Sequence, residues 1–204
     1  MKDILFYTIS LLTILNPIAA AAIMVSLVKF SEVKRVSRVT SFTVFIASVV
    51  TMIAGGYILK IFGINIPSIK AIGGVVLLII GINMIQGKSI VATNATDEEH
   101  EAAQEKEDVA VIPLAIPILF GPGLITTIIV LAEKATTLFQ KIELFGAIFL
   151  SSVVTYIVLS NASSISKFLG VNGLKIVTRI MGLVIGAIAF LFLVGGIKAL
   201  WMGG

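Results

Sequence analysis

Two proline motifs stand inside apolar, charge-free stretches of the chain: Asn16-Pro17 and Gly121-Pro122-Gly123. Proline removes a backbone N–H and displaces the preceding residue from helical geometry, so both motifs predict a broken helix. The freed polar groups cannot face lipid, and they must pair within the protein or line a wet cavity. A helix that restarts at Pro17 or Pro122 offers N–H groups to an anion, and the helix before it offers carbonyls to a cation. A zwitterion would satisfy both.

Polar residues near these motifs are further candidate ligands, each with a structural alternative. Thr126 and Thr127, one turn beyond the second motif, offer hydroxyls that could instead bond back to their own helix. Asn83 is a weaker candidate, because an amide inside a span also serves helix packing, and Asn16 shares this alternative. The predicted substrate-binding residues are Asn16, Pro17, Gly121, Pro122, Gly123, Thr126 and Thr127, with Asn83 as the weaker one. Pro113 and Pro117 are interpreted mainly as kinks at the start of their span.

The composition indicates a membrane protein. Hydrophobic residues make up 58% and charged residues 13% of the 204 residues, and the mean hydropathy is +1.12. In soluble domains, about 45–50% of the residues are apolar and about 25% are charged. The chain has no cysteine, which excludes disulfides and thiolate chemistry. Most Lys and Arg residues lie between apolar runs, where they set topology, so the net charge of +4 is not interpreted as a nucleic-acid-binding signal.

The charge-free runs predict an all-α, polytopic membrane protein with six transmembrane helices. A helix needs about 20 residues to cross about 30 Å of hydrocarbon. The predicted spans are 4–28, 39–59, 71–87, 109–132, 144–166 and 180–197. None of these ranges contains Asp, Glu, His or Cys. Hydrolase or metalloenzyme chemistry therefore has almost no groups to work with, and we expect neither an enzyme nor a metal site.

The basic residues predict an orientation. With the N-terminus outside, nine Lys and Arg residues fall in inner loops, and six fall on the outer side. The inner nine are Lys29, Lys34, Arg35, Arg38, Lys88, Lys106, Lys167, Lys175 and Arg179. Because cytoplasmic loops carry the excess of positive charge, both termini are predicted to lie outside.

The two halves of the chain align with each other. LNPIAAA resembles FGPGLIT, KIFGIN resembles KFLGVN, and KAIGGVVLLIIG resembles RIMGLVIGAIAF, at offsets of 105, 107 and 109 residues. Since each half has three spans, the second copy must enter the membrane from the opposite side, which makes the repeats inverted. Inverted repeats with matched broken spans are typical of secondary transporters. We predict a first repeat at 1–88, an acidic polar cytoplasmic linker at 89–108 and a second repeat at 109–204.

The LNPI of the first span, the IPLAIPILFGPG of the fourth, the six spans and the polar loop after the third resemble the MarC family over essentially the whole chain. The resemblance implies a SnatA-type transporter of small neutral amino acids, such as glycine and alanine, in the cell inner membrane. It also implies proton coupling and discontinuous first and fourth helices around the substrate. Asn16 and Pro17 match the family's NP, and 121–123 match its GPG. Ala19 and Ala22 stand where relatives often have glycine and proline, which implies a milder first break.

Two other classes of function remain open at this point. A membrane channel or exporter for small polar solutes would show conductance without saturation, and a non-transporting membrane scaffold would tolerate changes at Asn16 and Gly123. Glu32, Glu133 and Glu143 lie at predicted interfaces and are interpreted mainly as solvated charges, so the coupling ion, H⁺ or Na⁺, stays open. We expect no cofactor. The expected partners are a small neutral amino acid and the lipid bilayer, with a homo-oligomer left open and no nucleic acid.

Overall fold

The computed structural model describes residues 2–87 and 110–202, and in that part of the chain it contains helices and connections but no strand. The predicted linker, 89–108, lies outside the described residues. The helices are α1 (Lys2–Leu15), α2 (Pro17–Leu27), η1 (Phe30–Glu32), α3 (Val33–Ile61), α4 (Ile66–Gln86), η2 (Ala110–Leu119), α7 (Pro122–Lys134), α8 (Leu138–Ser160) and α9 (Ala162–Trp201). The all-α prediction is confirmed.

Five helical stretches are long and apolar enough to cross a membrane. They are Asp3–Leu27, Phe30–Ile61, Ile66–Gln86, Leu138–Ser160 and Asn172–Trp201. These stretches correspond to five of the six predicted spans. The range 109–132 is not among them, because its helix is interrupted between the end of η2 and the start of α7.

The irregular course of η2 follows from its prolines. Ile112 (φ −124°, ψ 123°) and Ile116 (φ −129°, ψ 123°) are extended inside an otherwise helical segment. Each precedes a proline, whose ring excludes helical geometry at the residue before it. The predicted kinks are therefore present. The start of the segment is held by α3, where the buried Thr40 hydroxyl donates a hydrogen bond to the Ala110 carbonyl at 2.8 Å.

Local capping signals place the start of α8 earlier than the charge-free run predicts. Thr137 and Gln140 form a reciprocal capping box, so the helix begins at Leu138. The helix begins six residues before the predicted 144, which is further than the predicted extension by a few residues, because the charge-free run excluded two charged residues that the helix contains. Lys141 is exposed, but Glu143 is only 6% exposed. The interpretation of Glu143 as a solvated interfacial charge is therefore wrong.

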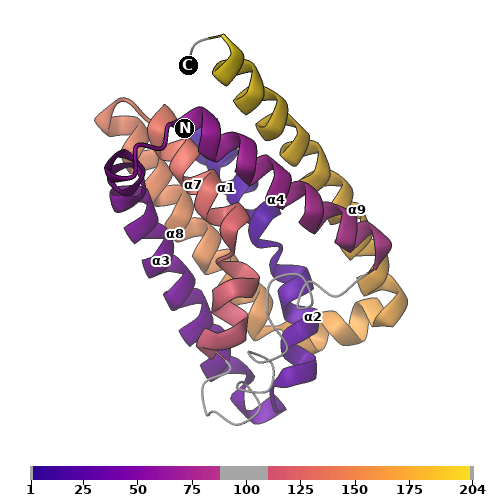
Figure 1. Cartoon of the computed structure of the whole chain (residues 1–204). Helices are drawn as coiled ribbons and strands as arrows, with labels where there is room; N and C mark the ends of the chain where they lie inside the picture. The colour runs from indigo at the N-terminus through magenta and orange to yellow at the C-terminus, as the bar shows by residue number, and fades with distance from the viewer. Residues whose placement is uncertain (1, 88–109, 203–204) are drawn as a thin grey trace.

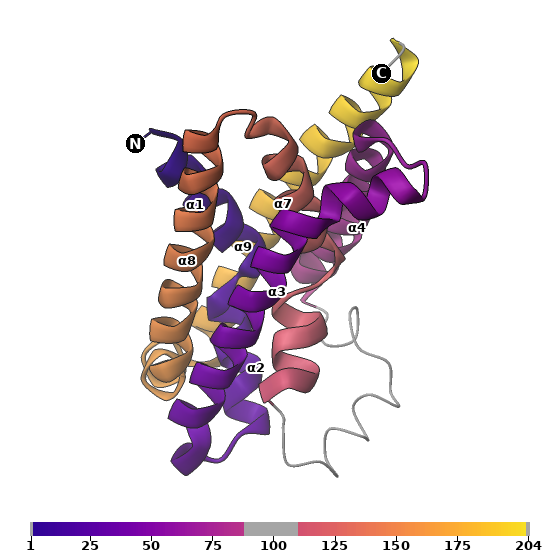
Figure 2. The same ribbon diagram turned by 90° about the vertical axis from the view of Figure 1, so that its left-hand side faces the viewer.

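The helices form two flanks joined by the interrupted helices. α4 and α9 make the most extensive helix pair and lie side by side (Figures 1 and 2). On the other flank, α8 packs against both α1 and α3. Between the flanks, α2 packs on α9, α7 packs on α4, and η2 packs on α3. The beginning of α1 and the end of α9 lie at the same end of the molecule (Figure 1).

Glycines allow the α4 and α9 backbones to touch. A Cβ atom at Gly81 would lie 2.9 Å from the Gly182 carbonyl oxygen, and one at Gly74 would lie 2.8 Å from the Ala189 carbonyl oxygen. Real Cβ atoms do not approach other atoms this closely. Small residues at such crossings are the usual means by which membrane helices pack.

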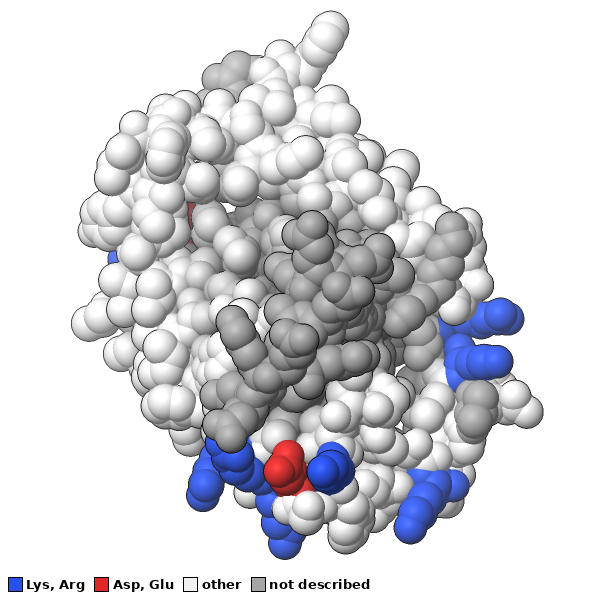
Figure 3. All heavy atoms as spheres, turned by 60° about the horizontal axis from the view of Figure 1, so that its bottom comes forward, with Lys and Arg blue, Asp and Glu red and all other residues white. Residues whose placement is uncertain are grey.

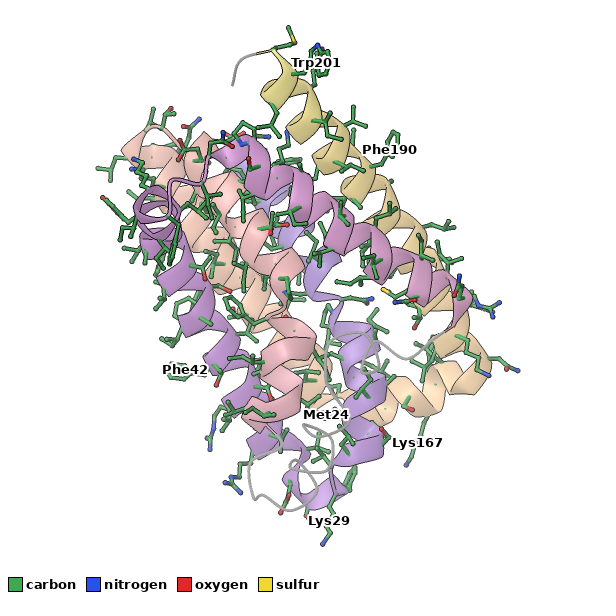
Figure 4. The ribbon with its side chains drawn as sticks, viewed as in Figure 1. Met24, Lys29, Phe42, Lys167, Phe190 and Trp201 are labelled. Atoms are coloured by element: carbon green, nitrogen blue, oxygen red, sulfur yellow. The ribbon has the colours of Figure 1, made fainter. Side chains whose placement is uncertain are left out.

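The outer surface is apolar around the bundle and basic at one end. Phe42 of α3 and Phe190 of α9 are exposed and point away from the bundle on opposite flanks (Figure 4). Such side chains suit a lipid environment and would be unfavourable in water. Lys and Arg side chains gather at the end opposite Trp201, where Lys29 and Lys167 lie (Figures 3 and 4).

Candidate functional site

The first interruption is a sharp corner at Asn16. Its backbone is left-handed (φ 44°, ψ 60°), and among the described residues it alone has a positive φ without being glycine. Its N–H donates to the Leu12 carbonyl at 2.9 Å, and its own carbonyl accepts from the Ala20 N–H at 3.2 Å. Its side-chain oxygen accepts from the Ala19 N–H at 3.5 Å. The corner is thus internally bonded, and α2 starts immediately after it at Pro17, which is buried.

The second interruption lies at Gly121, where the chain is extended (φ −98°, ψ 178°) before Pro122. The Gly121 carbonyl accepts from the N–H groups of Leu124 and Ile125 at 3.0 and 3.1 Å. In contrast to α2, α7 receives no side-chain cap at its first turn. The first N–H groups of a helix have no partner within it and carry its positive end. Pro122 has no N–H, and those of Leu124 and Ile125 are bonded to Gly121, so the Gly123 N–H beside the cavity is the group left for an anion.

Both interruptions face one cavity of about 30 Å³. Its walls come from the end of α1, the middle of α4, the end of η2, the start of α7 and one residue of α9. They are Ile14, Leu15, Asn16, Leu77, Ile80, Met84, Ile118, Leu119, Gly121, Gly123, Leu124 and Ile185. A water molecule needs about 10–15 Å³ of such space. The cavity therefore suits one or two water molecules, and an amino acid requires its apolar walls to move outward.

The chain was compared with known proteins. A family model described as MarC family integral membrane protein matches residues 1–201. The chain belongs to the MarC family. It is 36% identical over 195 residues to a UPF0056 membrane protein of Aquifex aeolicus, covering 94% of this chain and 91% of that one. It is also 36% identical over 192 residues to UPF0056 membrane protein MJ1677 of Methanocaldococcus jannaschii, covering 93% of each.

A bacterial relative, UPF0056 membrane protein YhcE of Escherichia coli, is 28% identical over 200 residues, covering 97% of this chain and 93% of its own. No solved structure matches the chain. These relatives come from different organisms, and their names describe membrane proteins without specifying an activity. The MarC chain is thus an integral membrane protein whose activity has to be argued from its site.

The predicted site residues of this MarC protein separate into two groups. Asn16, Gly121 and Gly123 line the cavity. The other five do not: Pro17, Pro122, Thr126, Thr127 and Asn83. Proline's role at both positions is to shape the backbone beside the cavity, and Pro122 itself is exposed.

The two threonines have structural uses in α7. The Thr127 hydroxyl donates to the Gly123 carbonyl at 2.8 Å, within the same helix. Thr126 is buried against Gly73 of α4, where a Cβ atom would overlap the threonine side chain. Asn83 is half-buried on α4, beside Met84 in sequence. Within the described residues, no group of three or more His, Cys, Asp or Glu side chains gathers as a metal site would need.

The cavity walls also contain residues that the sequence did not single out. Leu77 and Met84 of α4 are fully buried, and Met84 Sδ accepts a long hydrogen bond of 4.0 Å from Asn16 Nδ2. Ile185 of α9 is likewise buried. An aliphatic residue in an apolar span carries no local mark of such a role, so no sequence signal would have identified these three.

Proposed function

We propose that this MarC protein is a secondary transporter of small neutral amino acids, such as glycine and alanine, of the SnatA type. The observation that carries the proposal is the convergence of two interrupted helices, at Asn16 and at Gly121, on one buried cavity. Irregular backbone is tolerated at membrane depth only where protein or a cavity satisfies it. Discontinuous helices that meet in mid-membrane are how many secondary transporters hold substrate.

The polarity of the cavity suits a zwitterion. The uncapped start of α7 offers the Gly123 backbone N–H to a carboxylate. Asn16 can add its amide, because the sulfur to which it now donates is a weak acceptor. The last carbonyls of η2, at Ile118 and Leu119, suit an ammonium group. The remainder of the wall is aliphatic and closely packed, which favours a substrate with a small side chain.

We also infer that the chain forms six spans in two inverted repeats, with η2 and α7 together making the interrupted fourth span. The packing supports a two-fold relation: α1 lies on α8 as η2 lies on α3, and α2 lies on α9 as α7 lies on α4. The α4–α9 crossing agrees with it. With the sequence offset of 109 between the halves, Gly81 matches position 190 and Gly182 matches position 73. The Gly81–Gly182 contact should therefore recur between positions 73 and 190, and a contact is found one residue away, between Gly74 and Ala189.

Backbone geometry at matched positions supports the same relation. Gly63, before α4, and Gly170, inside α9, both have positive φ, 67° and 61°, and they occupy the same place in the KIFGIN and KFLGVN motifs. Positive φ is readily adopted by glycine. The first and last helices also begin and end on one side of the molecule (Figure 1), as an even number of crossings requires.

The basic end supports an orientation. Lys29, Lys34, Arg35 and Arg38 are exposed at or near the connection between α2 and α3, at the end opposite both termini (Figures 3 and 4). By the positive-inside rule this end faces the cytoplasm. Both termini then lie outside the cell inner membrane.

Transport by purified protein in proteoliposomes tests the proposal. We expect saturable uptake of glycine or alanine, and counterflow of labelled against unlabelled amino acid. In Asn16→Gly the left-handed backbone is retained while the amide is lost, so we expect uptake efficiency to fall by roughly tenfold, about 1.4 kcal/mol.

Asn65→Gly is the matched control. Asn65 is also an asparagine that caps a helix, accepting from the Ser68 N–H at 2.9 Å, but it is exposed in a connection. We expect its uptake to equal that of wild type. Conductance without counterflow would indicate a channel, and no flux of either kind would overturn transport altogether.

A further inference from the structure

One glutamate lies inside the bundle. Glu143 of α8 is 6% exposed, whereas the other described glutamates, Glu32 and Glu133, are exposed. Its neighbours Ile142 and Phe145 are exposed, which places the lipid-facing side of the helix away from the carboxyl. The Glu143 side chain therefore points towards the protein.

Glu143 belongs to the face of α8 that packs against α1. The buried residues Glu143, Ala147, Ser151 and Thr155 recur every four positions and so share one face. The Ser151 hydroxyl of this face donates to the Thr8 carbonyl of α1 at 3.5 Å. On the same side, a Cβ atom at Gly146 would lie 3.1 Å from Ile4 Cδ1. The carboxyl therefore lies in the α1–α8 interface.

The charged and titratable groups around this interface can be named element by element. On α1, Tyr7 is buried and Asp3 is exposed. The neighbouring ends of the other helices carry exposed charges: Lys141 on α8, Lys60 on α3, and Glu133 and Lys134 on α7. α2 carries none, and α9 joins α8 at its opposite end.

A carboxyl is a costly choice for this position. Charged side chains inside a bilayer are expensive, and those that occur mark ion pathways and proton relays. A purely structural polar contact at this position could be made by glutamine, which carries no charge to desolvate. What a carboxyl adds is the ability to gain and lose a proton.

The interface is mechanically connected to the substrate cavity. α1 continues from Tyr7 to Leu15, which lines the cavity beside Asn16. From Tyr7 to Asn16 the rise is about 14 Å at 1.5 Å per residue. A movement of α1 against α8 would therefore change the surroundings of the carboxyl and the shape of the cavity together.

We propose that Glu143 binds and releases the proton that couples transport to a pH gradient. The carboxylate takes up one proton from the aqueous phase on one side, forming its O–H bond, and that bond breaks when the proton is released to the other side. No oxidant, reductant or metal is needed. This inference rests on the proposed transport function.

The test uses full-length protein in proteoliposomes and two measurements: glycine counterflow without a pH gradient, and glycine accumulation driven by an imposed pH gradient. We expect Glu143→Gln to retain counterflow and to lose accumulation. Glu133→Gln, which neutralises an exposed glutamate near the same end, is the matched control and should retain both.

The outcomes separate the two proposals. Absence of counterflow in wild type overturns transport itself. Wild type that shows counterflow but no response to a pH gradient, or Glu143→Gln that accumulates glycine as wild type does, overturns the role of Glu143 alone. If Glu143→Gln fails to fold, Glu143→Asp decides: a shifted pH dependence of accumulation supports the role, and an unchanged one overturns it.

Discussion

Gly123 and Leu77 are in close contact, so a side chain at position 123 requires Leu77 to shift. A Cβ atom at Gly123 would overlap Leu77 Cδ2 and lie 3.2 Å from Leu77 Cγ. Both residues line the cavity, and Leu77 is fully buried. The absence of a side chain at Gly123 thus serves packing and, under the proposed function, access to the Gly123 backbone N–H. A loss of uptake on enlarging Gly123 alone would not separate these two uses.

A paired substitution separates them. Gly123→Ala should destabilise the protein by about 1–3 kcal/mol through overpacking, which corresponds to roughly 2–4 °C in Tm per kcal/mol for a chain of this size. Leu77→Ala in the same chain removes the overlapping atoms, so the double variant should be more stable than the sum of the single effects predicts. Thermal unfolding in detergent measures this. Strict additivity would show that the two side chains do not meet.

Among the elements, η2 deviates most from regular geometry, and its two ends are secured differently. Its prolines hold Ile112 and Ile116 extended, so part of its backbone cannot bond within a helix. The Phe120 N–H bonds to the Ala115 carbonyl at 2.8 Å, one residue further back than in an α-helix. At the other end, the carbonyl of Ala110 is satisfied from α3 by Thr40. The irregular helix therefore depends on its neighbour.

Thr40→Val tests this dependence. The substitution leaves the buried Ala110 carbonyl without its donor, which should cost about 1–3 kcal/mol and lower Tm accordingly. Thr51→Val is the control on the same helix, because the Thr51 hydroxyl donates at 2.9 Å to the Ala47 carbonyl of its own helix. That carbonyl keeps its place in the helical ladder, so we expect a much smaller change. Equal shifts of Tm in the two variants would argue against a special role for Thr40.

At the scale of the whole molecule, an apolar belt separates a basic end from the end that carries both termini (Figure 4). Such a distribution is that of a multi-pass protein held across a bilayer, and the proposed orientation places the basic end on the cytoplasmic side. Under the proposed inverted repeat and transport function, the two ends are alternative entrances to the same central cavity. Orientation and transport direction can then be examined together.

The absence of native cysteine makes the orientation directly testable. Ser31→Cys places a thiol in the exposed connection at the basic end, and Thr136→Cys places one in the exposed connection between α7 and α8. In intact cells, a membrane-impermeant maleimide should label Thr136→Cys and not Ser31→Cys. After permeabilisation both should react. Labelling of Ser31→Cys alone in intact cells would reverse the proposed orientation.

The sequence by itself determined the class of the protein and the positions at which its helices break. Charge-free runs of sufficient length require membrane helices, and proline acts on its own covalent neighbour, so the corners at Asn16 and Gly121 could be predicted without any tertiary contact. The sequence also distinguished the basic end, because topology follows the charges of short loops.

Only the tertiary structure decided how these features combine. Asn16 and Gly121 come from opposite halves of the chain, and they meet because α1, α4, η2, α7 and α9 pack around one cavity. Leu77 lines that cavity because of the way α4 faces its neighbours. The sequence around Leu77 is apolar throughout, so it does not show which residue faces the cavity. Glu143 is buried because α8 begins before it and packs this face against α1. Helix breaks and caps are set by residues that are adjacent in the sequence, whereas burial and side-chain contacts depend on which distant helices pack together.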